Sequence, residues 1–260
     1  MSNDHVIKEF LFVLKKRLIH SFSKVIRFIK RASLPKHIIT SENCFEIPII
    51  INNRNRYTFL KLMVDQLHSL GYKNIYILDN DSSYPPLLDY YKMVEANVIF
   101  LRQNVGYKAL WETDVFKQFK NNYYVYSDPD ILLGDNCPKD FVYHLYINLK
   151  KYPAKEKAGV ALKIDDLPDH YKLKNDVLKW EKVNWEKVLS ENVYDSLVDT
   201  TLALYKPLAH GNAEECAAIR VGGKLAAQHL PWYTDTQMVS EEELYYKNHA
   251  KTTSSYWSSK

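Results

Sequence analysis

The fold of this 260-residue chain is decided by the stretch Phe45-Glu46-Ile47-Pro48-Ile49-Ile50-Ile51-Asn52-Asn53-Arg54. Its nearly continuous apolar run predicts a buried strand over Phe45–Ile51, followed by a polar turn. Strand and helix patterns then alternate along the chain. The predicted segments are a helix Tyr57–Leu70, a strand Ile75–Leu78, a helix Pro86–Glu95, a strand Val98–Leu101, a helix Ala109–Phe119 and a strand Tyr123–Tyr126. This order predicts right-handed crossovers and a mostly parallel central sheet in an α/β domain.

The second half of the chain has a less regular pattern. It predicts a helix to about Lys151, a strand Gly159–Ile164, a Trp-rich charged stretch over Asp165–Glu191 and a strand Val198–Tyr205. The length favours one large domain over two independent ones. We expect this domain to span 44–251, with its halves at 44–135 and 136–251. A Ser- and Thr-rich segment, 252–260, is expected to be a flexible tail.

The first 36 residues form a separate segment with its own pattern. An apolar stripe at three- and four-residue spacing predicts an amphipathic helix. Its members are Ile7, Leu11, Leu14, Leu18, Phe22, Val25 and Ile29. Nine Lys or Arg stand against two acids in this segment, so we expect residues 1–31 to bind an anionic membrane surface. The alternative is a helix packed on its own domain or on a partner subunit. The acidic remainder of the chain argues against nucleic acid as a partner.

Cysteine content and hydropathy bear on where the protein works. Cys44, Cys137 and Cys216 have no metal-ligand spacing, and an odd number of cysteines favours a reducing compartment. No apolar run approaches the roughly 20 residues that span a bilayer. The sequence therefore predicts a cytoplasmic protein held at the inner face of the cytoplasmic membrane by its first helix.

Polar side chains follow each of the first four predicted strands. They are Asn52-Asn53-Arg54, Asp79-Asn80-Asp81-Ser82-Ser83, Asn104-Val105-Gly106-Tyr107-Lys108 and Ser127-Asp128-Pro129-Asp130. Any one of these sets is also what a turn or a helix cap requires. Because ligands bind at the carboxyl ends of parallel strands, the four sets together predict one cleft.

The triplet Asp128-Pro129-Asp130 presents two carboxylates at the end of an apolar, Tyr-rich strand. Carboxylate oxygens favour Mg²⁺ or Mn²⁺, and an ion held by one or two of them completes its shell with water and substrate phosphates. We therefore expect a divalent metal site that neutralises a diphosphate leaving group.

These motifs resemble the GT-A glycosyltransferases, in particular family 2-like enzymes of bacterial surface polysaccharide biosynthesis such as those of lipopolysaccharide or capsule. The resemblance covers roughly residues 45 to 135. It is carried by Ile47 to Arg54, by Ile77-Leu78-Asp79-Asn80-Asp81-Ser82 and by Asp128-Pro129-Asp130 as the Asp-x-Asp motif. It implies a single GT-A (Rossmann-like) domain whose first half binds the nucleotide sugar and whose second half binds the acceptor.

The resemblance also implies roles for individual residues. The nucleotide-sugar contacts would be Asn53, Arg54, Asp79, Asn104, Gly106 and Asp128. Asp128 and Asp130 would hold the metal. Gln228-His229-Leu230-Pro231-Trp232-Tyr233 is similar to the late segment that carries a metal-binding His in several GT-A enzymes, so His229 is the candidate third ligand, with His210 as its rival.

The acidic base motif of the family does not occur in its commonest form. Candidates for the base are Asp165, Asp166, Glu181 and Asp199. Asp199 is the first choice, because a carboxylate on a predicted hydrophobic strand is costly unless it has a task or a partner. Asp166 is the second choice. Alternatively, Asp199 stands at the start of the predicted strand only to form a hydrogen bond with the backbone.

The sequence and the resemblance together predict a metal-dependent glycosyltransferase of the hexosyltransferase type, and the resemblance implies that it inverts the anomeric carbon. Its donor would be a nucleotide sugar and its acceptor a hydroxyl of a glycan or lipid-linked molecule. A sugar-phosphate nucleotidyltransferase is the first alternative, but the loop after the first strand has none of the glycines expected there. A non-catalytic, membrane-recruited nucleotide or glycan binder is the second alternative.

Overall fold

The computed structural model describes residues 5, 15, 25–211, 216–235 and 239–249. The chain forms two compact units, 1–37 and 38–260. In the first, residues 25–32 are helical, and the stripe residues Val25 and Ile29 are 54% and 60% exposed. Apart from His5 and Lys15, the rest of the predicted amphipathic helix lies outside the described residues, as does the predicted tail. No helix in the described part of the chain combines the length and apolar character that crossing a membrane requires.

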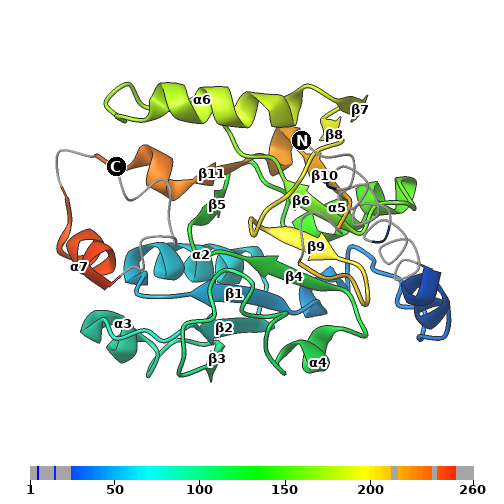
Figure 1. The fold of residues 1–260 in the computed structure, drawn as a ribbon, viewed down its shortest axis with the longest axis horizontal. Helices are drawn as coiled ribbons and strands as arrows, with labels where there is room; N and C mark the ends of the chain where they lie inside the picture. The colour runs from blue at the N-terminus through cyan, green and yellow to red at the C-terminus, as the bar shows by residue number, and fades with distance from the viewer. Residues whose placement is uncertain (1–4, 6–14, 16–24, 212–215, 236–238, 250–260) are drawn as a thin grey trace. The chain divides into compact units, whose positions relative to one another are not determined.

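The second unit alternates strands and helices in its first half, as the sequence predicts (Figure 1). Its strands are β1 Ile49–Asn53, β2 Ile75–Asp79, β3 Asn97–Phe100, β4 Tyr124–Ser127, β5 Ile131–Leu133, β6 Lys157–Val160, β7 Val188–Ser190, β8 Val193–Tyr194, β9 Ala203–Tyr205, β10 Ala218–Val221 and β11 Ala227–His229. Its α-helices are α2 Tyr57–Leu70, α3 Pro85–Tyr90, α4 Phe116–Phe119, α5 Phe141–Lys151, α6 Lys174–Lys182 and α7 Glu241–His249. Four 3-10 turns are η1 Cys44–Glu46, η2 Val183–Trp185, η3 Gly223–Leu225 and η4 Leu230–Tyr233.

The central sheet has the strand order β3-β2-β1-β4-β9-β6-β10-β8-β7, and β5 pairs with β11 in a small second sheet. The strands from β3 to β4 are parallel, as predicted. Beyond β4 the sheet is mixed, because β9 runs antiparallel to both β4 and β6 while β6 and β10 are parallel. The domain is therefore α/β with a parallel half and a mixed half.

Strand β1 lies inside the sheet and is buried on both faces. Ile49 and Ile51 belong to the core cluster that includes Leu60 of α2, whereas Ile50 packs in the opposite cluster with Trp111. This alternation follows from the two-residue period of a strand. It explains why the sequence of β1 is a continuous apolar run.

Several predicted elements are shorter than expected. The predicted helix Ala109–Phe119 is helical only at α4, and in the turns before it the Thr113 hydroxyl donates to the Ala109 carbonyl at 2.8 Å. The predicted strand Val198–Tyr205 begins only at Ala203. Thr200 uses its carbonyl to accept a hydrogen bond from the Asp128 backbone at 2.8 Å. The prediction of α2 over Tyr57–Leu70 is confirmed to the residue.

Gly159, in the buried strand β6, has no room for a side chain. A Cβ added there would lie 2.6 Å from Cγ1 of Val198 and 3.2 Å from the Cβ of Ala203. We expect Gly159→Ala to lower the free energy of unfolding by about 1–3 kcal/mol through overpacking, measured by urea denaturation. Gly134→Ala is the control, since its added Cβ would come no closer than 3.7 Å to the Ala226 carbonyl. Equal stability of the two variants would contradict this packing.

Candidate active site

A cleft of about 670 Å³ opens at the carboxyl ends of β1 and β4. The predicted site residues that line it are Arg54, Asn104, Gly106, Asp128, Asp130, Asp199 and His229. They come from five separate segments of the chain. The prediction of one cleft at the strand ends therefore agrees with where the structure places most of these residues.

The side of the cleft next to β2 and β3 is built from side-chain amides. Asn80 donates from Nδ2 to the Gly106 carbonyl at 2.8 Å and accepts at Oδ1 from the Val105 backbone at 2.8 Å. Asn104 accepts from the Gly106 backbone at 3.0 Å. Gly106 has φ 80° and open space where a Cβ would stand. The loop after β3 is thus held against the end of β2 with its backbone facing the cleft.

Asn53 and Asp79 do not line this cleft, although both are predicted nucleotide contacts. Asn53 donates to the Tyr91 hydroxyl at 2.9 Å, and that hydroxyl donates to Oδ1 of Asp79 at 3.0 Å. Asp79 also accepts from the Ser82 backbone at 3.2 Å. Burial raises the pKa of Tyr91, so this tyrosine stays protonated and remains a donor. The two residues join the ends of β1 and β2, and it is Asn52, on the other face of β1, that lines the cleft.

Asp128 and Asp130 lie together in the cleft and differ in their surroundings. Burial, the neighbouring Asp130 and Asp199 raise the pKa of Asp128 well above its usual range, although the Thr200 hydroxyl donates to its Oδ2. Burial also acts to raise the pKa of Asp130, but the charge and hydrogen bond of His229 and the charge of Arg56 outweigh it and lower this pKa. The surroundings of Asp128 therefore favour the protonated carboxyl, whereas those of Asp130 favour the ionised carboxylate.

His229 reaches Asp130 through the small second sheet. Strand β11 runs antiparallel to β5, with His229 opposite Ile131, and the Leu230 backbone donates to the Asp130 carbonyl at 2.8 Å. His229 Nε2 consequently lies 3.5 Å from Oδ2 of Asp130. His210, the rival candidate, lies outside the lining of the cleft and packs near the Trp111 ring, with 6.0 Å between ring centroids.

Two side-chain atoms at this point, both of types that can bind a metal ion, have no hydrogen-bond partner among the described residues. Oδ1 of Asp130 is buried and accepts no hydrogen bond from the described residues, and Nδ1 of His229 is likewise unpaired. No group of three or more His, Cys, Asp or Glu in the described ranges is arranged to hold a metal. Asp130 and His229 would therefore be the protein ligands, with Asp128 beside them. An ion there would need water or substrate oxygens to complete its shell.

The candidate bases occupy different positions. Asp199 is exposed, lines the cleft and stands in a loop rather than on the predicted strand, so the reason given for choosing it was wrong. Asp166 is exposed outside the lining of the cleft and pairs with Lys163. Burial acts to raise the pKa of Asp166, but its hydrogen bonds from Lys163 and Tyr233 outweigh this and lower it.

Glu181, a candidate from the sequence, lines the opposite wall of the cleft and is only 2% exposed. It forms a buried ion pair with Arg220 of β10 and accepts from Asn184 at 3.0 Å. Burial is the main cause of its raised pKa. The sequence analysis missed Arg220, although an arginine within an apolar strand was a visible signal.

Helix α7 brings the end of the described chain to the cleft. Arg56 pairs with Glu243, and its guanidinium lies 3.5 Å from the centroid of the Tyr246 ring. Arg54 donates from Nη1 to the His249 carbonyl at 2.8 Å. Arg54 and Arg56 therefore line the cleft together with the acids. Nothing in the local sequence of α7 indicates that this helix contacts the two arginines.

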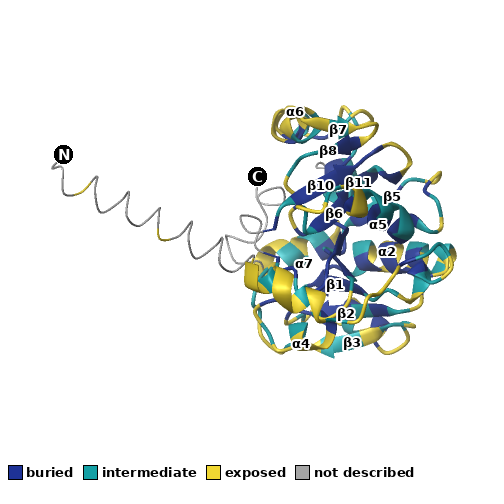
Figure 2. Cartoon of the chain, turned by 90° about the vertical axis from the view of Figure 1, so that its right-hand side faces the viewer, coloured by how far each residue is buried: buried dark blue, intermediate teal, exposed yellow. Residues whose placement is uncertain are grey.

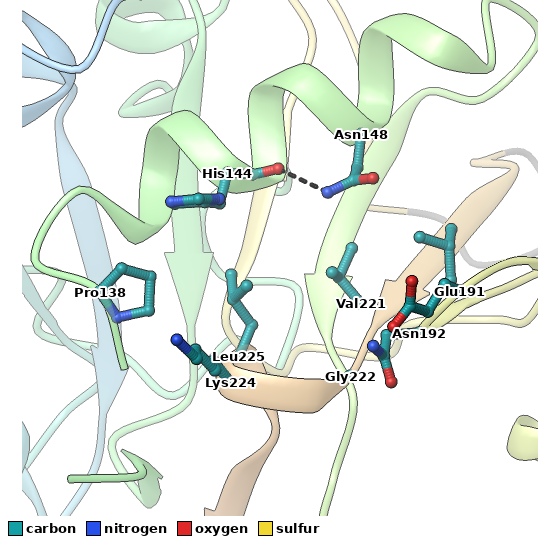
Figure 3. A pocket seen from close by; sticks show the side chains of 10 residues that line it. Pro138, His144, Asn148, Glu191, Asn192, Val221, Gly222, Lys224 and Leu225 are labelled. Carbon is teal, nitrogen blue, oxygen red and sulfur yellow. Dashed lines mark hydrogen bonds between the residues drawn. The ribbon is translucent and has the colours of Figure 1, made fainter. Parts of the chain in front are cut away.

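A second, smaller cavity of about 310 Å³ lies between α5 and β10 (Figure 3). His144 and Asn148 of α5 line it, and the Asn148 amide donates to the His144 carbonyl at 2.9 Å. Lys224 and Glu191 stand at its other side. It contains none of the predicted site residues.

Comparison with known proteins gives only distant structural likenesses. No protein-family model matches the sequence, and no curated protein matches it. The mannosyltransferase PcManGT of Pyrobaculum calidifontis, solved with GDP-Man and Mn²⁺, is 11% identical with a TM-score of 0.48, covering 90% of this chain and 70% of its own. Glucosyl-3-phosphoglycerate synthase of Mycobacterium tuberculosis, solved with phosphoglyceric acid, is 14% identical with a TM-score of 0.44, covering 75% and 78%. At these values we draw no inference about this chain from them.

The contact between Thr200 and Asp128 gives a test of the site geometry. Thr200→Val keeps the shape but leaves the half-buried Asp128 carboxyl without its donor, so we expect the free energy of unfolding to fall by about 1–3 kcal/mol. Thr200→Ser retains a hydroxyl and is the control. Urea denaturation of both variants measures the difference. A valine variant as stable as the serine variant would show that this hydrogen bond does not hold Asp128.

Proposed function

We propose that this chain transfers a sugar from a nucleotide-sugar donor to a hydroxyl of a glycan or lipid-linked acceptor, with Mn²⁺ or Mg²⁺ as cofactor. The observation that carries this proposal is the half-buried Asp130 and His229 pair, which has atoms without hydrogen-bond partners in the same cleft as Arg54 and Arg56. A carboxylate and an imidazole can bind a divalent ion, and two arginines beside them can bind the phosphate oxygens of a diphosphate held by that ion. No other cavity described above combines these groups.

Some residues of the cleft would stabilise the leaving group, and another would activate the acceptor. When bound, the metal would neutralise charge on the departing nucleoside diphosphate. Arg54 and Arg56 add positive charge on the same side. Asp199, an exposed carboxylate in the cleft, would take the proton of the acceptor hydroxyl as the bond to the anomeric carbon forms. Glu181 is less suited to this step, because its carboxylate is already engaged by Arg220.

The proposed setting is the inner face of a bacterial cytoplasmic membrane, in the synthesis of a surface polysaccharide. Support comes from the described part of the first unit, where Phe28 is 73% and Ile29 60% exposed beside Arg27, Lys30 and Arg31. Exposed apolar side chains among basic ones are typical of a helix that lies in a membrane interface. The acceptor would then reach the enzyme on a lipid carrier.

Replacing Asp130 tests the metal site. We expect Asp130→Asn to lower metal-dependent nucleotide release by about 100-fold or more, because the variant loses the charge that binds the ion. The assay uses a panel of UDP, GDP and CMP sugars with and without Mn²⁺. Asp135→Asn, an exposed acid outside the cleft, is the control. Full metal-dependent activity of Asp130→Asn would refute the assignment.

The same assay separates the alternative functions. Release of UDP or GDP, or of CMP from a CMP sugar, supports glycosyl transfer. Formation of nucleoside triphosphate from the sugar nucleotide and pyrophosphate would indicate a nucleotidyltransferase instead. Binding of a sugar nucleotide without turnover of any member of the panel would favour the non-catalytic binder.

Deleting residues 1–31 tests the membrane setting. We expect the shortened chain to sediment less with vesicles that contain anionic lipid, because it lacks the basic segment with its apolar stripe. Donor hydrolysis should persist, since the cleft is built from the second unit alone. Unchanged sedimentation would contradict a membrane role for this segment.

A further inference from the structure

Helix α7 packs against one wall of the candidate active site, and its residue Tyr246 lines the cleft. Figure 2 shows much of α7 coloured as exposed, as expected for a helix that packs by one side only. The contacts of that side fall into two groups. One group holds α7 on other parts of the domain, and the other engages the two arginines of the cleft, Arg54 and Arg56.

The first group anchors α7 on the domain. Glu242 is 8% exposed and accepts from the Thr58 backbone at 3.0 Å and from the Thr58 hydroxyl at 2.6 Å. Thr58 is in the first turn of α2, which contains no acid of its own, so Glu242 supplies the negative charge that a helix N-terminus favours. The Tyr245 hydroxyl donates to the Ser83 carbonyl at 3.0 Å, and its ring packs 4.9 Å from that of Tyr84. None of these contacts uses an arginine.

The second group occupies the arginines. Arg56 pairs with Glu243, and its guanidinium lies 3.5 Å from the centroid of the Tyr246 ring. Arg54 donates from Nη1 to the His249 carbonyl at 2.8 Å. Arg56 is only 7% exposed, so its pair with Glu243 is screened by water less than a surface ion pair is. Helix α7 thus places a carboxylate on a guanidinium that a phosphate oxygen could use.

Arg56 also stands near the candidate metal site. Burial acts to raise the pKa of Asp130, whereas the charges of His229 and Arg56 lower it. A diphosphate held by an ion at Asp130 would therefore have oxygens within reach of the Arg56 guanidinium. Because so little of Arg56 is exposed, a second anion gains its N–H groups by displacing Glu243.

Glu243 has a second cation close to it. Its Oε1 lies 3.8 Å from Nζ of Lys247, one helical turn further along α7. A glutamate that precedes a lysine by four residues is the favourable order for such a pair. Leaving Arg56 would therefore not leave the Glu243 carboxylate without a partner. A diphosphate carries more charge than one carboxylate and can bind a guanidinium through two oxygens, so it is suited to win this competition.

We propose that α7 regulates the site as a competitive latch, in which Glu243 and the His249 carbonyl hold Arg56 and Arg54 until a diphosphate displaces them. The apparent affinity for diphosphate is then lowered in proportion to the fraction of molecules whose latch is closed. By thermodynamic reciprocity, bound diphosphate weakens the attachment of α7 to the same degree. The inference rests on the proposed function in that the ligand is a diphosphate, but it does not require sugar transfer.

Glu243→Gln tests the competition. The substitution keeps the size of the side chain and removes the charge that holds Arg56. Titration calorimetry of the full chain uses inorganic pyrophosphate with Mg²⁺, so neither base nor sugar enters the measurement. We expect the variant to bind pyrophosphate about fivefold more tightly than the unsubstituted chain. Glu241→Gln is the matched control, because it removes the same charge from an exposed acid in the same turn, and its affinity should not change.

Hydrogen exchange of the unsubstituted chain measures the release of α7 itself. We expect saturating pyrophosphate with Mg²⁺ to speed amide exchange over Glu241–His249 about threefold or more, because the contacts with Arg54 and Arg56 are lost. Exchange over α5, Phe141–Lys151, is the internal control and should stay the same. This measurement needs no substitution, so it stands even where a variant folds poorly.

Three results would overturn the latch. The first is an affinity of Glu243→Gln for pyrophosphate no higher than that of Glu241→Gln. The second is slower exchange of α7 with pyrophosphate bound, since that would indicate a helix that closes over its ligand. The third is no binding of pyrophosphate by the unsubstituted chain or by either variant.

The latch and the proposed function can fail separately. Turnover of a sugar nucleotide combined with equal pyrophosphate affinities of the Glu243→Gln and Glu241→Gln variants would overturn the latch and leave the transferase. Tighter pyrophosphate binding by Glu243→Gln and faster exchange of α7, without turnover of any sugar nucleotide, would support the latch and count against sugar transfer.

Discussion

Two half-buried carboxylates that follow β4 impose the constraint on which the rest of the site depends. Asp128 and Asp130 are separated by one proline and both lie in the cleft. Acids this close cannot both stay charged in a desolvated site unless partners are supplied. The partners are Thr200, which donates to Asp128, and His229, which stands beside Asp130. Both come from the second half of the chain, which must therefore fold back across the ends of the first strands.

This requirement accounts for the mixed half of the sheet. Strand β9 follows the Thr200 loop and inserts antiparallel between β4 and β6. Strand β11 pairs antiparallel with β5, the strand directly after the acids, and so carries His229 to them. A continued series of parallel crossovers would have placed both segments at new sheet edges, away from β4. The parallel half thus creates the cleft, and the antiparallel returns supply its partners.

The opposite walls of the cleft differ in chemistry. The wall near β1 carries Arg54 and Arg56, braced by α7, and is suited to phosphate. The wall near α6 carries the buried acid Glu181, which is paired with Arg220. In the proposed reaction, the diphosphate of the donor would therefore lie against the wall near β1.

The sequence by itself determined the parallel half of the sheet, helix α2 and the position of the cleft, because apolar periodicity is local and parallel strands end at a common edge. Only the tertiary structure decided which side chains face that cleft. Asn53 and Asp79 were expected there, yet Tyr91 turns both away. Asp199 reaches the cleft from a loop, and His229 rather than His210 approaches the acids. These outcomes depend on contacts between residues distant in sequence, which no local pattern encodes.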